Sequence, residues 1–227
     1  MMDLRPYRQN EARLADWLPW AGLVADGVVI NKDGAFQRTL TFRGPDLDSS
    51  TLSELMGAST RLDNALKRFG SGWCLHVEAR RSATNEYPIS DWPDPLSWLI
   101  DQERAQDFAA AGGRFESAYY LTLSWLPPSE TSGKFEAALF ENGAASASIG
   151  VDYKACLASF IEETQSFKAL LDLVMNDARF LDGAETLTYL HSCISDRPHS
   201  IAVPPTPFHI DELVSDSALV GGVAPKL

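Results

Sequence analysis

Cysteine and long apolar runs are both scarce in this chain. Three cysteines occur in 227 residues, at Cys74, Cys156 and Cys193, and an odd number of widely spaced cysteines does not form the disulfide framework of a small secreted domain. We therefore expect reduced thiols. The longest apolar stretch, residues 18–30, is interrupted by proline, glycine and aspartate, and it is shorter than the roughly 20 residues of a membrane-spanning helix. Because the polar start does not resemble a secretion signal, we expect a cytoplasmic location.

Basic residues are outnumbered by acidic ones. The chain has 19 Lys and Arg against 31 Asp and Glu, which gives a formal net charge of −12. Proteins that bind duplex nucleic acid neutralise phosphates with a clustered basic face, so direct binding of nucleic acid is not expected. One local basic set exists, formed by Lys67, Arg68, Arg80 and Arg81. A single-stranded DNA-binding module therefore stays open as an alternative.

Catalytic and cofactor motifs are also missing. A P-loop requires the pattern G-x-x-x-x-G-K-[ST], whereas the Gly133-Lys134 pair is followed by Phe135. The four histidines have no partner at zinc-ligand spacing. We expect no catalytic, cofactor-binding or metal-binding residue in this chain. A small free-standing enzyme with an unrecognised site near Glu185 and His191 is the alternative of that class.

What is present is the composition of a globular domain, with 45% apolar residues, 15 glycines and 13 prolines. Residues 28–30 and 35–43 flank the turn signal Asn31-Lys32-Asp33-Gly34, which predicts a β-hairpin. Apolar periodicity then predicts four helices and three strands. The helices are expected over about 50–69, 92–108, 152–174 and 184–195, and the strands over 73–79, 115–126 and 178–181.

The order of these elements predicts an α+β fold with a mostly antiparallel sheet and helices packed on one face. Two long helices match at a constant offset, for example Leu52 with Leu157 and Leu62 with Phe167. This match favours a ferredoxin-like split β-α-β arrangement with additions, although any two amphipathic helices share such a period. The expected domain organisation is an N-terminal arm, an α+β domain with a flexible loop near 129–150, and a Pro-rich tail, at residues 1–22, 23–197 and 198–227.

Tryptophans outside the periodic segments are candidate partner contacts. Trp17 and Trp20 lie in the arm, and Trp92 lies in a proline-containing loop. Tryptophan is enriched at protein interfaces because it buries a large apolar area and keeps a polar N–H. We add Asp33 and Phe36, from the predicted hairpin, to this candidate interface. The alternative is that these side chains pack against the core.

A collinear set of short segments carries a family resemblance. The segments are Leu14–Trp20, Val28–Arg38, Phe42–Asp48, Arg61–Leu66, Phe115–Ser117, Leu121–Leu123 and Glu185–His191. In this order they resemble the amino-terminal part of the TrbE/VirB/CagE family, the large ATPases of conjugative type IV secretion systems. The resemblance extends from about residue 3 to the end of the chain.

The resemblance implies a non-catalytic assembly domain that docks the motor to the inner-membrane secretion platform. Members of the family continue into a RecA-like ATPase domain with Walker motifs, and this sequence stops before it. ATP and Mg²⁺ are therefore expected only in that motor domain. The implied partners are other type IV secretion subunits at the inner membrane and the chain's own ATPase domain, with self-association as a further option. The implied location is cytoplasmic and peripheral to the inner membrane.

Overall fold

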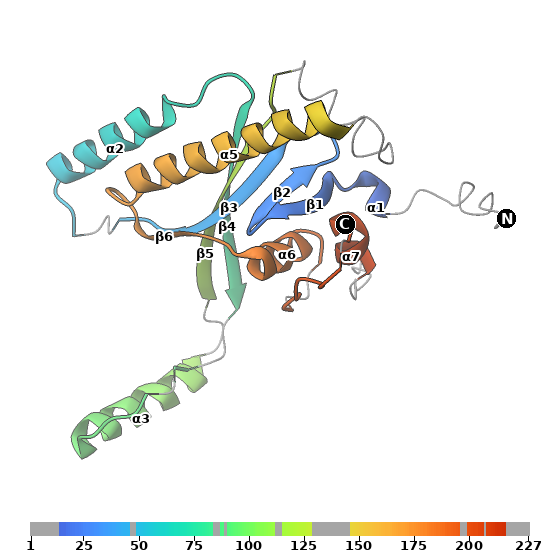
Figure 1. Cartoon of the computed structure of the whole chain (residues 1–227). Helices are drawn as coiled ribbons and strands as arrows, with labels where there is room; N and C mark the ends of the chain where they lie inside the picture. Colours follow the sequence, from blue (N-terminus) through green and yellow to red (C-terminus); the bar gives the residue numbers. More distant parts are fainter. Residues whose placement is uncertain are drawn as a thin grey trace, which may run out of the picture.

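The computed structural model describes residues 14–45, 49–83, 87–88, 90–111, 115–128, 146–195, 199–206 and 208–216. A six-stranded sheet forms the centre of the fold (Figure 1). Its strand order is β1-β2-β3-β5-β4, and β6 also pairs with β3. Every strand pairing is antiparallel. The strands are β1 (Trp20–Ala25), β2 (Val28–Asn31), β3 (Phe36–Arg43), β4 (Trp73–Ala83), β5 (Phe115–Trp125) and β6 (Asn176–Phe180).

Helices cover both faces of this sheet. α2 and α5 lie side by side on one face, whereas α6 and α7 lie on the opposite side, and α3 projects away from the body (Figure 1). The α+β class and the mostly antiparallel sheet are therefore confirmed, and the sequence did not predict the helices on the second face. The helices are α1 (Leu14–Trp17), α2 (Leu52–Leu66), α3 (Pro95–Ala111), α5 (Ser146–Leu171), α6 (Gly183–Ser192) and α7 (Ile210–Asp216).

The predicted hairpin is confirmed as β2 and β3. Gly34 adopts a φ of 83° in the turn, a conformation that only glycine adopts without steric cost. The Asp33 carboxylate accepts a hydrogen bond from the Ala35 N–H at 2.9 Å, which is the usual role of aspartate in a turn. β1 was not predicted, because Trp20–Ala25 contains a glycine and has no clear alternation of apolar and polar residues.

β3 is the central strand and has neighbours on both edges. β5 pairs with it from Phe36 to Phe42. β2 and β6 share the other edge, with Ile30 opposite Phe36 and Leu40 opposite Phe180. The strands β6-β3-β5-β4 are thus neighbours, with α2 between β3 and β4 in the chain and α5 between β5 and β6. This order is compatible with the ferredoxin-like arrangement, which stays a prediction.

Two helix starts differ from the sequence-based expectation. α2 begins at Leu52 rather than near residue 50, because Thr51 is its N-cap and forms a reciprocal capping box with Glu54. α5 begins at Ser146, earlier than expected from Asp152, and the start of this helix lies within the loop predicted near 129–150. The remainder of that loop, residues 129–145, lies outside the described residues.

Three hydrophobic clusters hold the layers together. Two lie between the sheet and the α2–α5 layer, around Leu40 and Phe167 and around Phe36 and Phe160. The third lies on the α6–α7 side and joins β1, β2, α6, α7 and Ile201. Trp20 from the predicted arm and Val214 from the predicted tail belong to this third cluster. The domain boundaries themselves stay a prediction.

Among the described helices, none is both long enough and apolar enough to be a membrane-span candidate.

Candidate interaction surfaces

α3 forms an appendage between β4 and β5. Its first turn is fixed by Asp94, whose carboxylate accepts hydrogen bonds from the Ser97 N–H at 2.9 Å and the Ser97 hydroxyl at 3.1 Å. The adjoining loop contributes Tyr87, whose hydroxyl donates to Asp101 at 2.6 Å and whose ring lies edge-on to Phe108 at 5.5 Å. The hydrogen bond to Asp101 raises the pKa of Tyr87. These contacts are all local to the appendage.

The appendage exposes most of its large apolar side chains. Leu99 is 58% exposed, and no other described element packs extensively against α3. Figure 1 shows the helix beyond the end of the β4–β5 ribbon, away from the other helices. Several exposed large apolar side chains on one element indicate an interaction site. We define this patch, the α3 patch, by five exposed residues: Trp92, Leu96, Trp98, Leu99 and Ile100.

Acidic residues surround the α3 patch. Asp101, Glu103 and Asp107 lie on the helix together with a single basic residue, Arg104. Two further aspartates, Asp91 and Asp94, precede the helix. The appendage is therefore apolar at its first turns and negatively charged around them. A surface of this kind is complementary to an apolar groove with a basic rim.

The predicted interface residues separate into an exposed and a buried group. Trp17 is 76% exposed on α1, and Trp92 belongs to the α3 patch. Asp33 is exposed, and its carboxylate stabilises the turn through the Ala35 N–H. The partner role of these three residues stays a prediction. Within the described residues, α1, which carries Trp17, has no extensive contact with α3, which follows Trp92.

Trp20 and Phe36 are buried, so the expectation that they are exposed was wrong. Trp20 lies in the cluster on the α6–α7 side, because β1 pairs with β2 and turns this side chain inward. Phe36 is 0% exposed. Its ring lies 6.3 Å from Trp125 and 5.6 Å from Phe160, both in stacked orientation. A side chain enclosed in this way serves packing and is not available to a partner.

A polar network joins the sheet to α6 and was not visible in the sequence. The Glu78 carboxylate accepts hydrogen bonds from Arg80 at 2.8 Å and from the Tyr189 hydroxyl at 2.9 Å. Arg80 also donates to the Ser192 hydroxyl. Burial raises the pKa of the Tyr189 hydroxyl in this network. The hydrogen bonds of Glu78 and Arg80 to Tyr189 and Ser192 thus anchor α6 to β4.

The two residues considered for an unrecognised enzyme have structural contacts. His191 is fully buried, and its Nδ1 lies 3.1 Å from the Val214 carbonyl oxygen of α7, which can only accept a hydrogen bond. Glu185 forms a bidentate pair with Arg179 at 2.7 and 2.8 Å and also accepts the Asp182 N–H. No group of three or more possible metal ligands occurs within the described ranges.

The basic set considered for DNA binding is partly neutralised. Lys67 forms an ion pair with Asp63 at 2.5 Å, and Arg80 forms one with Glu78 at 2.8 Å. The Arg81 guanidinium lies over the Phe115 ring, 4.5 Å from its centroid. Two of the four positive charges in this set, those of Lys67 and Arg80, are therefore matched by carboxylates.

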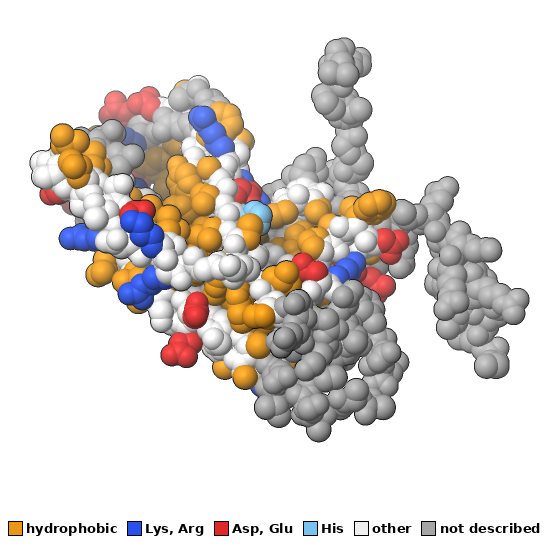
Figure 2. Space-filling model, turned by 90° about the horizontal axis from the view of Figure 1, so that it is seen from above, with side chains coloured by type: hydrophobic (Ala, Val, Ile, Leu, Met, Phe, Trp, Pro, Cys, Tyr) orange, Lys and Arg blue, Asp and Glu red, His pale blue; other side chains and the backbone are white. Residues whose placement is uncertain are grey.

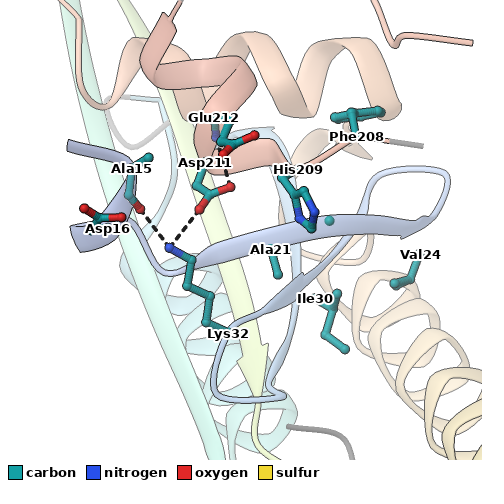
Figure 3. A pocket seen from close by; sticks show the side chains of 11 residues that line it. Ala15, Asp16, Ala21, Val24, Ile30, Lys32, Phe208, His209, Asp211 and Glu212 are labelled. Atoms are coloured by element: carbon teal, nitrogen blue, oxygen red, sulfur yellow. Dashed lines mark hydrogen bonds and ion pairs between the residues drawn. The ribbon is translucent and has the colours of Figure 1, made fainter. Parts of the chain in front are cut away.

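A pocket of about 530 Å³ lies where α1, β1 and β2 meet α7 (Figure 3). The Lys32 ammonium group donates to the Ala15 carbonyl oxygen at 2.7 Å and pairs with the Asp211 carboxylate at 2.8 Å. Apolar side chains such as Val24 and Ile30 also line the pocket. Lys32 therefore joins α1 and α7 to the hairpin, with its charge matched inside the fold. No spacing in the sequence predicts this pair, because its members lie far apart along the chain.

Comparisons with known proteins identify the family. The family profile described as the N-terminal domain of the type IV secretion system ATPase VirB4/TrbE matches residues 27–133. "Conjugal transfer protein TrbE" of Rhizobium radiobacter is 30% identical over 243 residues, a match that covers 100% of this chain and 29% of that protein. A probable conjugal transfer protein TrbE of Sinorhizobium fredii, named as the first portion of a divided TrbE, is 40% identical over 130 residues, covering 56% of this chain and 87% of that protein. The chain thus spans less than a third of the first relative and most of the second, and it belongs to the VirB4/TrbE family as an N-terminal domain.

Proposed function

We propose that this chain is a non-catalytic assembly domain that docks the ATPase of a conjugal-transfer system to the inner-membrane secretion platform. Family membership supports a role in conjugal transfer. The sequence contains no P-loop motif, which a nucleotide-binding role of the usual kind would need. ATP and Mg²⁺ then act in the motor domain of the system. This chain holds that motor domain in position at the secretion platform.

The α3 patch is the observation that carries this proposal. A helix of about this length is only marginally stable in water when nothing packs against it. Burying one large apolar side chain contributes roughly 1.5–3 kcal/mol. The exposed Leu96, Leu99 and Ile100 therefore represent several kcal/mol of stabilisation that a partner supplies. Trp92 and Trp98 add the side-chain type most enriched in interface hot spots.

Charge favours a membrane-protein partner. The cytoplasmic loops of inner-membrane proteins carry an excess of Lys and Arg. This chain has a net charge of −12, and Asp91, Glu103 and Asp107 lie around the α3 patch. Anionic lipid would repel the same carboxylates. We therefore propose a peripheral position on the cytoplasmic side, where α3 binds basic segments of the membrane subunits.

The test places a charge in the α3 patch. In the double variant Leu96→Glu/Leu99→Glu, co-purification of the membrane subunits of the same secretion system is expected to fall at least tenfold. The melting temperature is expected to stay within a few degrees, because both side chains are exposed. Leu52→Glu/Met56→Glu on α2 is the matched control. Seen from above, the α2–α5 face also carries hydrophobic side chains beside charged ones (Figure 2), and Leu52 and Met56 are as exposed as the α3 residues.

Two results would contradict the proposal. Equal loss of co-purification in the α2 control would show that any added negative charge interferes, so the α3 patch would have no special role. Binding of ATP by the wild-type chain, measured by calorimetry, would contradict the non-catalytic assignment. A gel shift of single-stranded DNA at low salt would favour the DNA-binding alternative instead.

A further inference from the structure

The two outer edges of the sheet differ in how they are protected. β1, at one edge, is six residues long, contains two register irregularities and packs against α7. β4, at the other edge, pairs with β5 over eleven residues without any register shift. Within the described residues, β5 is the one strand that pairs with β4. β4 therefore presents a long row of backbone N–H and C=O groups without strand partners.

β4 lacks several of the devices that usually prevent pairing at an exposed edge. Such edges are normally short, or they contain proline, a bulge or charged residues, lysine above all, and of these β4 has only the charged residues Glu78, Arg80 and Arg81. β4 has the sequence WCLHVEARRSA, with neither proline nor lysine. Val77 is 70% exposed in the middle of the strand, and Ala79 and Ala83 are exposed on the same face. A long regular edge with an exposed β-branched residue favours addition of another strand.

We propose that β4 pairs antiparallel with β4 of a second copy of this chain, with the two-fold axis at Ala79, so that the two sheets become continuous. The axis is perpendicular to the sheet, and each residue therefore faces a residue on the same face of the other copy. This surface is separate from the α3 patch. The pairing goes beyond the proposed docking function and does not depend on it.

The charges of β4 select this register. Glu78 and Arg80 already form an ion pair within each chain. With Ala79 opposite its equivalent, Glu78 of each copy also faces Arg80 of the other, so this pairing of opposite charges extends across the two strands. Val77 then faces Arg81, so no like charges are opposed. A shift of one residue in either direction centres the axis on Glu78 or on Arg80. Each of these shifts places a charged side chain opposite its own copy, which is destabilising.

A second consequence concerns the appendages. α3 follows the C-terminal end of β4 in the chain. In an antiparallel pair the C-terminal ends of the two β4 strands lie at opposite ends of the joined edge. The two α3 patches are therefore separated, and both remain accessible to other partners. A variant can therefore lose the β4–β4 pairing and keep the docking of α3, and the reverse also holds.

The first experiment replaces Val77 with charged residues in the full chain and measures the affinity of the dimer. Sedimentation of the wild type over a concentration series from about 1 μM to 1 mM is expected to show a monomer–dimer equilibrium. Val77→Lys places two like-charged pairs against Arg81 and is expected to weaken the dimer roughly two- to thirtyfold. Val77→Glu is the matched control and is expected to dimerise at least as well as the wild type. Adding Arg81→Glu to Val77→Lys is expected to restore the dimer.

The second experiment tests the register by disulfide formation. In a background with Cys74, Cys156 and Cys193 replaced by serine, Ala79→Cys places two thiols directly opposite each other, within disulfide reach. Ala83→Cys is the matched control, because Ala83 faces Leu75 in this register and lies far from its own copy. Oxidation is expected to crosslink the Ala79→Cys variant and not the Ala83→Cys variant.

Three outcomes would overturn the proposal. The first is a wild type that stays monomeric throughout the concentration series. The second is a dimer whose affinity is the same in the Val77→Lys and Val77→Glu variants. The third is a dimer that forms no disulfide at Ala79→Cys, or that forms it equally at Ala83→Cys. Circular dichroism of each variant distinguishes a lost interface from a lost fold.

Discussion

The centre of the sheet and the β4–β5 ribbon are built from similar residues but have opposite surroundings. At the centre, Phe36 and Leu40 of β3 are fully buried between the helices and the neighbouring strands. On the β4–β5 ribbon, Val77 in the middle of β4 and Phe115 at the start of β5 are exposed although they have the same apolar character. The centre therefore provides the stability of the domain. The ribbon and α3 expose apolar side chains and, at β4, an edge that pairs with no further strand within the described residues.

The largest expected effect is a difference in the free energy of unfolding between a variant at the centre of the sheet and a variant in α3. Phe36→Ala removes a buried ring that contacts Tyr153 and Phe160. We expect a loss of about 3–5 kcal/mol in the free energy of unfolding. Leu99→Ala in the α3 patch removes an exposed side chain and is expected to change this free energy by less than about 0.5 kcal/mol. Urea denaturation followed by circular dichroism measures both. Similar losses in the two variants would show that α3 is part of the stable core.

A smaller effect is expected from comparing two threonines of β3, one in the interior and one near the surface. The Thr39 and Thr122 hydroxyls are hydrogen-bonded at 2.9 Å in the interior, whereas Thr41 donates to the Tyr119 carbonyl oxygen near the surface at 3.1 Å. Thr39→Val removes this buried hydrogen bond and is expected to cost about 0.5–1.5 kcal/mol, because the Thr122 hydroxyl also interacts with Tyr189. Thr41→Val is expected to cost less than about 0.5 kcal/mol, because water replaces the lost bond.

The double variant Thr39→Val/Thr122→Val is the control for that measurement. Removing both hydroxyls leaves no unsatisfied polar group, so stability is expected to return close to the wild-type value. Additive losses in the double variant, measured by the same urea denaturation, would contradict the role of the hydrogen bond.

The smallest expected effect depends on pH. The hydrogen bonds from Arg179 lower the pKa of Glu185 in the folded state. A carboxyl group with a lowered folded pKa stabilises the fold above its unfolded pKa of about 4.3, and this stabilisation is lost as the pH falls through the folded pKa. Because the pair is largely exposed, Arg179→Gln is expected to cost only about 0.5 kcal/mol at pH 7.

Urea titrations at pH 7 and pH 3 measure this dependence. The difference between wild type and Arg179→Gln is expected to shrink at the lower pH. Arg43→Gln, at an exposed position of β3, is the control and is expected to show no such pH dependence. A difference that grows on acidification would contradict the assigned cause.

Local chemistry made much of the fold predictable. The Asp33-Gly34 turn predicted the β2–β3 hairpin, and apolar periodicity predicted α2, α3, α5, α6 and the strands β4, β5 and β6. These elements depend on contacts between neighbours in the chain. The candidate interface was predicted less well. Trp17 and Trp92 are exposed as expected, but Trp20 and Phe36 are enclosed by residues from distant parts of the sequence.

The sequence by itself determined the family, most of the long helices and strands, and which residues of each predicted strand share a face. It could not determine how far that face is covered. Trp73, Leu75 and Val77 alternate identically along β4, yet Trp73 and Leu75 pack against the cluster beneath α2 and α5 while Val77 remains exposed. Periodicity depends on the geometry of one strand, whereas burial depends on where a helix from another part of the chain ends. Only the tertiary structure therefore decided which apolar residues form the core and which remain exposed on the β4 edge and the α3 appendage.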